Sequence, residues 1–336
     1  MCDLMAGAPY GVIATLGPAT SQTADWLALR SAGATGFRLN TSHLTLDALQ
    51  EWLARWQQAD LDCGLVLDLQ GSKWRLGQLA ETELGAGRQV RFVHARQAAA
   101  DELPVPHADF FRAAQQATGE VVLNDGRVRV ALQWAEADAA GGTVVQGGRV
   151  SAAKGITLPN SPFRVEALSD KDAAIVELTR RLSGIAYAVS YVRDALELEQ
   201  YRTWFGGEAQ LIAKIERPSA VDDALSIGRQ ANAVWVCRGD LGAEMGLRGM
   251  AQAVARLSAQ LQAGQFSVPV WMAGQVLEHM THCAQPTRAE VCQLYDVLAQ
   301  GYAGVVLSDE TALGHFAEEA CRVAALFCES KPPSRG

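Results

Sequence analysis

Residues 185–237 read IAYAVSYVRDALELEQYRTWFGGEAQLIAKIERPSAVDDALSIGRQANAVWVC, and their pattern is the clearest indication of the fold. Short apolar runs alternate in it with amphipathic stretches, in the order 185–191, 195–205, 210–215, 218–229 and 233–237. The apolar runs are typical of parallel strands that are buried on both faces. Parallel strands need crossover connections, and the amphipathic stretches fit as the crossover helices. The stretch therefore predicts consecutive β–α units.

The same alternation continues in both directions along the chain. Further strand-like runs are residues 11–16, 36–39, 64–69, 268–273 and 304–307. Further helical stretches are residues 23–32, 46–58, 170–182, 250–263, 288–300 and 318–328. Eight strands that are each followed by a helix match a (β/α)8 TIM barrel. An open doubly wound sheet would account for only about six of these units, so we predict an α/β barrel.

One interval, between residues 77 and 160, breaks the alternation. It contains short strand-like pieces at 89–92, 121–123, 127–132 and 143–150, separated by turn signals such as Asn124-Asp125-Gly126. We therefore predict a small β-rich lid domain inserted after the third strand. The predicted domains are residues 1–77 with 158–336 for the barrel, and residues 78–157 for the lid.

Composition narrows the function classes. The 336 residues are 49% hydrophobic and 20% charged, as in a chain that buries a full core, and the net charge is −8. The acidic net charge and the lack of a basic stripe argue against nucleic-acid binding. The lack of a long apolar run argues against a membrane span. Residues 1–5, MCDLM, do not resemble a secretory signal, and the seven scattered cysteines fit a reducing compartment. We expect a cytoplasmic protein.

Chemistry in a TIM barrel lies at the carboxyl ends of the strands. Glu216 and Asp240 follow neighbouring strands and offer the hard oxygen ligands that Mg²⁺ prefers. Lys214 lies two residues before Glu216, so both side chains share one face of the strand, where the lysine could stabilise a phosphoryl group or an enolate. Arg38 offers a planar fork for phosphate oxygens. A helix that starts at Gly239 would direct free N–H groups at a carboxylate.

Each of these segments also has a plain structural explanation. A Lys-x-Glu at a strand end is commonly a solvated pair, and an Arg-Gly-Asp is commonly a turn before a helix. Their joint occurrence at neighbouring strand ends predicts metal-assisted chemistry on a small anionic substrate. The residues alone indicate nothing finer.

The chain resembles the pyruvate kinase family, in the family's order and over nearly its whole length. The matching segments are ATLGPAT (14–20), RLNTSH (38–43), DLQGSKWRLG (68–77), KGITLP (154–159), LSDKD (168–172), SYVR (190–193), AKIE (213–216), RGDLG (238–242), PTRAE (286–290) and LSDETA (307–312). The resemblance implies a barrel with an inserted lid. It also implies that phosphoenolpyruvate and ADP are the substrates and that pyruvate and ATP are the products.

The resemblance assigns roles to residues by position. It makes Glu216 and Asp240 ligands of Mg²⁺ or Mn²⁺, and Lys214 the catalytic cation. Phosphate binding falls to Arg38, with Arg75 nearby. The remaining expected roles are substrate carboxylate binding by the N–H groups of Gly239 and Asp240, proton relay by Ser308, nucleotide binding by Pro18, His43 and Lys154, and lid closure by Asp125. A plain turn aspartate explains Asp125 equally well.

The resemblance also implies a monovalent-cation site made by Asn40, Ser42 and Asp68 with the carbonyl of Leu69. Members that need K⁺ usually carry Thr-Lys after the aspartate and a glutamate close by, whereas this chain has Leu-Gln and Lys73. The pattern resembles the K⁺-independent subgroup, in which a fixed lysine charge neutralises the aspartate. The alternative for Lys73 is an ordinary surface lysine. We expect activity that does not require K⁺.

Two departures from the family pattern leave alternatives open. The chain ends soon after the eighth barrel helix, so we expect no effector control through the family's C-terminal domain. For the same reason the family's usual tetramer is in doubt, and a homodimer through the barrel is the alternative. Gly274 replaces a family threonine beside the reacting carbon. The alternatives are metal-dependent enolate chemistry of the lyase or aldolase type on a different pyruvate-like substrate, and a catalytically weak regulatory binding protein.

Overall fold

The computed structural model describes residues 10–99, 101–117, 119–124, 126–159, 161 and 168–328. The chain forms two compact units. The barrel unit comprises Met1–Gln70, Leu168–Arg238 and Gln252–Gly336, and the β-rich unit comprises Gly71–Ala167 and Gly239–Ala251. The predicted domain boundaries at 77/78 and 157/158 stay a prediction.

Across the described residues of the barrel unit, eight parallel strands close into a barrel in the order β1-β16-β15-β14-β13-β12-β3-β2. The strands are β1 Gly11–Leu16, β2 Gly36–Asn40, β3 Leu65–Leu69, β12 Ile185–Val189, β13 Gln210–Ile215, β14 Ala233–Cys237, β15 Val270–Ala273 and β16 Gly304–Leu307. All neighbouring strands are parallel, as in the β1–β2 register that pairs Thr15 with Arg38. The predicted (β/α)8 barrel is confirmed.

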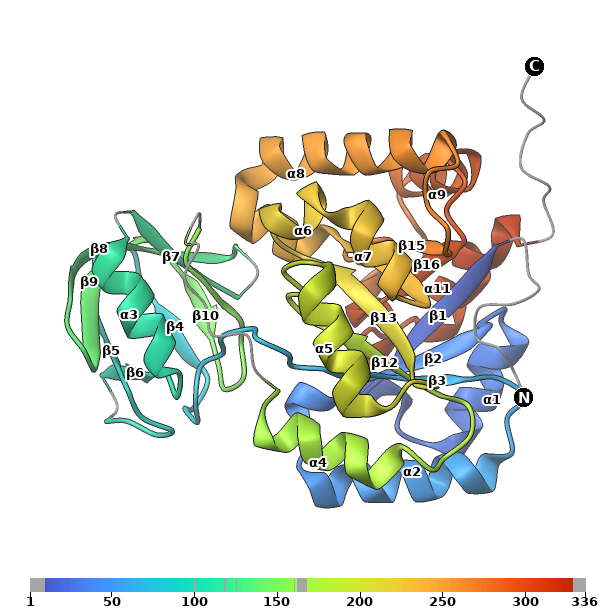
Figure 1. Ribbon diagram of the computed structural model, residues 1–336, viewed down its shortest axis with the longest axis horizontal. Helices are drawn as coiled ribbons and strands as arrows, with labels where there is room; N and C mark the ends of the chain where they lie inside the picture. Colours follow the sequence, from blue (N-terminus) through green and yellow to red (C-terminus); the bar gives the residue numbers. More distant parts are fainter. Residues whose placement is uncertain are drawn as a thin grey trace. The chain divides into compact units, whose positions relative to one another are not determined.

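Helices surround these strands (Figure 1). They are α1 Thr23–Ser31, α2 Leu46–Ala59, α4 Asp170–Thr179, α5 Ala195–Phe205, α6 Pro218–Asp222, α7 Ala224–Gln230, α8 Arg238–Gln262, α9 Arg288–Ala299, α10 Asp309–Ala312 and α11 Ala317–Ala324. Short 3₁₀ turns are η1 Pro18–Thr20, η2 Thr41–His43, η3 Glu278–Thr281 and η4 Ala325–Phe327. Side chains that accept an N–H of the first turn fix several starts, as Ser169 does for α4 and Asp194 does for α5.

Among the predicted bounds that were wrong, three have clear local reasons. The strand predicted at 185–191 ends at Val189, because Tyr191 adopts a left-handed backbone conformation with φ of 60°. The helix predicted at 218–229 is two helices, α6 and α7. The helix predicted at 250–263 belongs to α8, which begins at Arg238 and is kinked at Gly246, where φ is 70°. Glycines in this segment weakened the helical pattern that the sequence showed.

The inward-facing side chains of the barrel change from apolar to charged along the strands. Alternate residues of the strands form an apolar cluster of Ile13, Val66, Ala186, Ala188, Ile212, Ala233, Trp235, Cys237, Trp271, Ala273 and Val306. Because strand side chains alternate with a period of two, the next residue on the same face after Val66 is Asp68, and the next after Ile212 is Lys214. Both are buried. The apolar interior therefore changes to charged side chains at the carboxyl ends of the strands.

In the β-rich unit, the described strands form two sheets. A six-stranded sheet has the order β11-β7-β8-β9-β5-β6, and a small sheet pairs β10 with β4. The strands are β4 Thr82–Leu84, β5 Gln89–Val93, β6 Glu102–Pro104, β7 Glu120–Leu123, β8 Val128–Ala135, β9 Ala139–Gln146, β10 Gly148–Val150 and β11 Ile156–Thr157. The single strand predicted at 143–150 is β9 and β10, which belong to different sheets.

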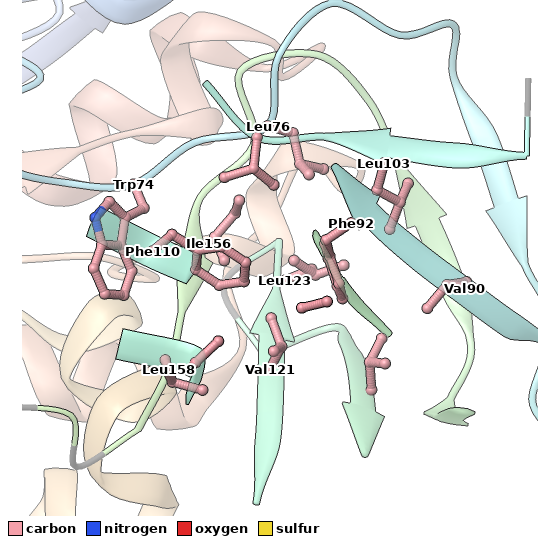
Figure 2. Packing of buried hydrophobic residues seen from close by; sticks show 14 of the residues in the cluster. Trp74, Leu76, Val90, Phe92, Leu103, Phe110, Val121, Leu123, Ile156 and Leu158 are labelled. Atoms are coloured by element: carbon pink, nitrogen blue, oxygen red, sulfur yellow. The ribbon is translucent and has the colours of Figure 1, made fainter. Parts of the chain in front are cut away.

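One helix of this unit, α3 Ala108–Gln116, was not predicted. It packs against β8 and β9, and its Phe110 is fully buried. Figure 2 shows Phe110 in this core, together with Trp74, Phe92 and Leu123. The Phe110 and Trp74 rings meet edge to face, with centroids 5.5 Å apart. A nine-residue helix between strands is too short for its periodicity to stand out in the sequence.

Within the described residues, no helix is both long and apolar enough to cross a bilayer.

Candidate active site

The centre of the candidate site is Asp68, at the end of β3. Its Oδ2 accepts from Arg38 Nε at 2.7 Å and lies 2.6 Å from Arg38 Nη2. Its Oδ1 lies 3.2 Å from Lys214 Nζ, which comes from β13. Strands β2 and β3 are neighbours, and residues at their carboxyl ends on the inward face meet over the apolar cluster. One carboxylate thus joins two cations from different strands.

These contacts set the charge states. Burial alone would raise the pKa of Asp68, but the charges of Lys214 and Arg38 outweigh burial and hold this pKa below its usual range. Burial would lower the pKa of Lys214, yet the Asp68 and Glu216 carboxylates raise it above its usual range. The pKa of Arg38 is raised in the same way by Asp68 against the effect of burial. All three groups are charged near neutral pH.

Lys214 places its ammonium among three oxygens. Nζ lies 2.9 Å from Glu216 Oε1 and 3.2 Å from Asp68 Oδ1, and it donates to Ser190 Oγ at 2.9 Å. Of the three N–H donors of the ammonium, hydrogen bonds to Asp68 and Ser190 use two, and the Glu216 contact is an ion pair. A phosphoryl group that binds Lys214 would therefore approach an ammonium that already lies close to three oxygens.

Glu216 follows β13 and is fully buried. Its Oε2 accepts the backbone N–H of Tyr191 at 2.7 Å, while its Oε1 faces Lys214. The left-handed conformation of Tyr191 belongs to the loop that provides this N–H. One oxygen of Glu216 is thus held by the backbone, and the other already lies against a cation.

Sequence reasoning gave no role to Ser190 and Thr15, which complete this arrangement. Ser190 Oγ donates to the Leu69 carbonyl at 2.8 Å and lies 3.2 Å from Asp68 Oδ1. Thr15 Oγ1 accepts from Arg38 Nη1 at 2.9 Å and donates to a carbonyl of β16. The signal that could have found both is the strand period, because each lies on the inward face at a strand end.

The ends of β15 and β16 are tied together by Glu310. This buried carboxylate accepts the backbone N–H of Leu277 at 2.9 Å and that of Ser308 at 2.6 Å. Arg238 donates to the carbonyl of Gly274 through Nε at 2.9 Å and Nη2 at 2.6 Å. Glu310 and Arg238 therefore fix the two segments that carry the predicted residues Ser308 and Gly274. Sequence reasoning missed both holding residues.

Gly274 has a backbone reason to be glycine. Its φ is 83°, and the following Gln275 has a φ of 52°. Residues with a Cβ are disfavoured in the left-handed region, and β-branched residues most of all. The prediction from sequence considered only the loss of a hydroxyl at this position, whereas the structure shows that the backbone itself favours glycine there.

The other predicted barrel residues lie at the same strand ends. Pro18 begins η1 and His43 ends η2, and both side chains are exposed. Asn40 Oδ1 accepts the N–H of Ser42 at 3.2 Å. Lys171, which had no predicted role, donates from Nζ to the Thr41 carbonyl at 2.6 Å.

The β-rich unit carries the remaining predicted residues. Lys73 Nζ contacts Asp240 Oδ1. Arg75 Nη1 donates to the Ala153 carbonyl at 2.7 Å, and Lys154 is half-buried. Gly239 lies at the start of α8, where an added Cβ would meet open space. Asp125 lies outside the described residues.

The chemistry of Glu216 fits a divalent cation. Its Oε1 is a hard oxygen that already lies against the ammonium of Lys214. Across the described residues, no group of three or more His, Cys, Asp or Glu side chains gathers to hold a metal ion. A cation here would therefore depend on few protein ligands, as Mg²⁺ does when phosphate and water fill its other positions.

Comparison with known proteins gives one family. A family model described as "Pyruvate kinase, barrel domain" matches residues 9–321. A pyruvate kinase of Agrobacterium vitis is 32% identical over 323 residues, which cover 93% of this chain and 66% of that protein. A pyruvate kinase of Mycobacterium tuberculosis is 33% identical over 330 residues, which cover 94% of this chain and 69% of that protein. The chain spans about two thirds of the length of these curated relatives.

Proposed function

Because the chain belongs to the pyruvate kinase family, whose barrel-domain model covers residues 9–321, we propose that it transfers a phosphoryl group from phosphoenolpyruvate to ADP. The bond from the enol oxygen to phosphorus breaks, a bond from the ADP β-phosphate oxygen to phosphorus forms, and the enolate takes a proton at carbon to give pyruvate. The observation that carries the proposal is the ion-paired group of Arg38 with the buried Asp68, Lys214 and Glu216 at the carboxyl ends of the strands.

Arg38 binds and orients the phosphate in this proposal. Its Nε and Nη2 are anchored on Asp68 and its Nη1 on Thr15. Each terminal nitrogen carries a second hydrogen that can be directed at phosphate oxygens. Because three contacts fix the guanidinium plane, the phosphate meets a donor that needs no reorganisation. Arg75 of the β-rich unit is the second predicted phosphate ligand.

Lys214 stabilises the charge that develops as the phosphoryl group leaves the enol oxygen. The transition state of such a transfer is loose, so catalysis depends mainly on positioning and electrostatics. Asp68 and Glu216 keep the lysine protonated, and Ser190 fixes the direction of its ammonium. When Lys214 gives up its contact with Glu216, one donor turns to the phosphoryl or enolate oxygen.

Glu216 would hold the divalent cation, with Asp240 of the β-rich unit as the predicted second ligand. When bound, Mg²⁺ or Mn²⁺ supplies charge neutralisation to the phosphate and to the enolate oxygen. The backbone N–H of Tyr191 keeps one oxygen of Glu216 in place, so its other oxygen is presented in a fixed direction. The N–H groups of Gly239 and Asp240 are the proposed substrate carboxylate site.

The remaining assignments extend the proposal. Pro18, His43 and Lys154 contact the nucleotide, and Ser308 takes part in the proton relay to the enolate. Asn40, Ser42 and Asp68 stand in the positions of the family's monovalent-cation site, and we propose that Lys73 makes K⁺ unnecessary. We place the protein in the cytoplasm, with a homodimer through the barrel as the proposed assembly.

The backbone at Gly274 bears on the alternative of a different enolpyruvyl substrate. That alternative was suggested by glycine in place of threonine, but a φ of 83° already favours glycine at this position. The buried charges of Lys214 and Glu216 likewise favour an active site over a regulatory binding site, because burying charged groups is costly. The kinase reaction is therefore the function that the site supports best.

The test is pyruvate formation from phosphoenolpyruvate, ADP and Mg²⁺, with and without K⁺ in a sodium-free buffer. We expect turnover in both buffers and a loss of about 100-fold or more in Lys214→Met, as when a transition-state donor is removed. Arg256→Met, in an exposed pair with Asp222, is the control that should keep full activity. A folded wild-type protein without turnover, or unimpaired Lys214→Met, would refute the proposal, and strong activation by K⁺ would refute the role of Lys73.

A further inference from the structure

The loop between β12 and α5 touches the candidate site on one side and a buried ion pair on the other. Ser190 and Tyr191 face the site, through the contacts of Ser190 with Lys214 and of the Tyr191 N–H with Glu216 Oε2. Tyr191 has a φ of 60°, which is unusual for a residue with a bulky side chain. A conformation of this kind persists only where the surroundings hold it.

The next two residues of the loop show what holds it. The Val192 carbonyl accepts from Arg217 Nε at 3.5 Å, and the Arg193 N–H donates to Glu197 Oε2 at 2.5 Å. Arg217 Nη2 lies 3.7 Å from the same Glu197 oxygen. We call Glu197 and Arg217 the loop clamp. Both side chains are buried, with 2% and 8% of their surfaces exposed.

The loop clamp connects the loop to the backbone segment that carries Glu216. Arg217 follows Glu216 directly in the chain, and Glu197 lies in the first turn of α5. The clamp therefore holds Val192 and Arg193 from the same backbone segment that carries the carboxylate. Tyr191 lies between these clamped residues and Ser190, and its N–H is the donor to Glu216.

From this geometry we infer that Glu197 and Arg217 are positioning residues for Glu216. They hold the Tyr191 backbone so that its N–H stays on Oε2 and Oε1 stays directed at Lys214 and at a divalent cation. The inference rests on the proposed function, because it uses Glu216 as a metal ligand. A buried ion pair is weak evidence for a role in stability, so the clamp needs a test that separates positioning from stability.

The test measures Mn²⁺ binding to the full chain by electron paramagnetic resonance of the free ion, without substrate or nucleotide. Glu197→Gln keeps an acceptor for the Arg193 N–H but removes the charge that pairs with Arg217, whereas Glu197→Ala removes both. Residues that orient a metal ligand typically change affinity by about 10- to 100-fold. We expect about 10-fold weaker binding in Glu197→Gln and a larger loss in Glu197→Ala. Asp222→Asn, in the exposed pair with Arg256, should bind as the wild type does.

The outcomes separate the two proposals. If the wild type binds Mn²⁺ and both Glu197 variants bind within twofold of it, the clamp is structural only and the positioning role is wrong, whatever happens to the melting temperature. If the wild type binds no Mn²⁺, the role of Glu216 as a metal ligand fails, and the positioning role fails with it. If Glu197→Ala does not fold, Mn²⁺ binding by Glu197→Gln and Arg217→Lys decides between a positioning role and a structural role. Arg217→Lys is informative because lysine keeps the charge without the planar fork.

Discussion

Asp68→Asn tests whether the two cations at the strand ends depend on a single carboxylate. The substitution keeps the shape of the side chain and removes its charge. Arg38 and Lys214 would then face each other across a neutral amide, with Glu216 as the remaining nearby carboxylate. Because Lys214 is buried and the Arg38 side chain is only 12% exposed, water can replace little of the lost charge.

The magnitude follows from the contacts. At the 2.6 Å and 3.2 Å separations of Asp68 from Arg38 and Lys214, an effective dielectric constant of about 20 gives gross attractions of about 6 and about 5 kcal/mol. Desolvation of the ions offsets much of this gain, and removal of one partner from a buried pair typically costs about 3–5 kcal/mol. We therefore expect the free energy of unfolding to fall by about 3–5 kcal/mol near neutral pH.

Urea unfolding of wild type and Asp68→Asn across pH is the assay. The pKa of Asp68 is lowered in the folded state, so its stabilisation is complete above the ordinary aspartate pKa of about 4 and is lost as pH falls through the folded value. The gap between the two proteins should therefore be constant around neutrality and should narrow in acid below about pH 4. A gap under about 1 kcal/mol near neutral pH would show that the pairs merely offset their desolvation. A gap that widens in acid would contradict the lowered pKa of Asp68.

Two further predictions concern stability. Phe110→Ala should lower the free energy of unfolding of the β-rich unit by about 3–5 kcal/mol, because it leaves a cavity beside Trp74. Near-UV circular dichroism of the tryptophans reports the change. A loss below about 1 kcal/mol would contradict the packing in Figure 2. Gly274→Ala should lower the free energy of unfolding, measured by chemical denaturation, by about 1–2 kcal/mol because φ is 83°. Gly207→Ala, where an added Cβ meets open space, should leave it nearly unchanged. Equal effects would show that the left-handed backbone is not what requires glycine at position 274.

The barrel could be predicted because each of its units repeats the same local signals. Every strand is a short apolar run and most helices are amphipathic, so eight weak signals reinforce one another. Helix α3 in the β-rich unit had no such repetition to support it. The single run at 143–150 was divided between two sheets because a glycine, Gly147, separates β9 from β10. Pairing of that kind depends on partners distant in sequence, which a local pattern does not specify.

The candidate site could be predicted in its charged residues but not in the groups that orient them. Arg38, Lys214 and Glu216 stand at strand ends within segments typical of the family, so position alone indicated them. Glu310 was missed because its partners are two backbone N–H groups, at Leu277 and Ser308. Tyr191 was missed because its contribution is a backbone conformation, and an aromatic residue gives no signal for a positive φ.

The charge balance of the site links its stability to its proposed function. Arg38 and Lys214 are matched by Asp68 and Glu216, so these four ion-paired side chains are together neutral. A neutral group can be buried without a large unpaired charge, but it gives little net attraction to an anion such as phosphoenolpyruvate. A divalent cation on Glu216 would give the same four residues a net charge of about +2, and the attraction of opposite charges would then favour the substrate. We therefore expect metal binding to strengthen the binding of phosphoenolpyruvate, and by thermodynamic linkage phosphoenolpyruvate should tighten metal binding by the same factor.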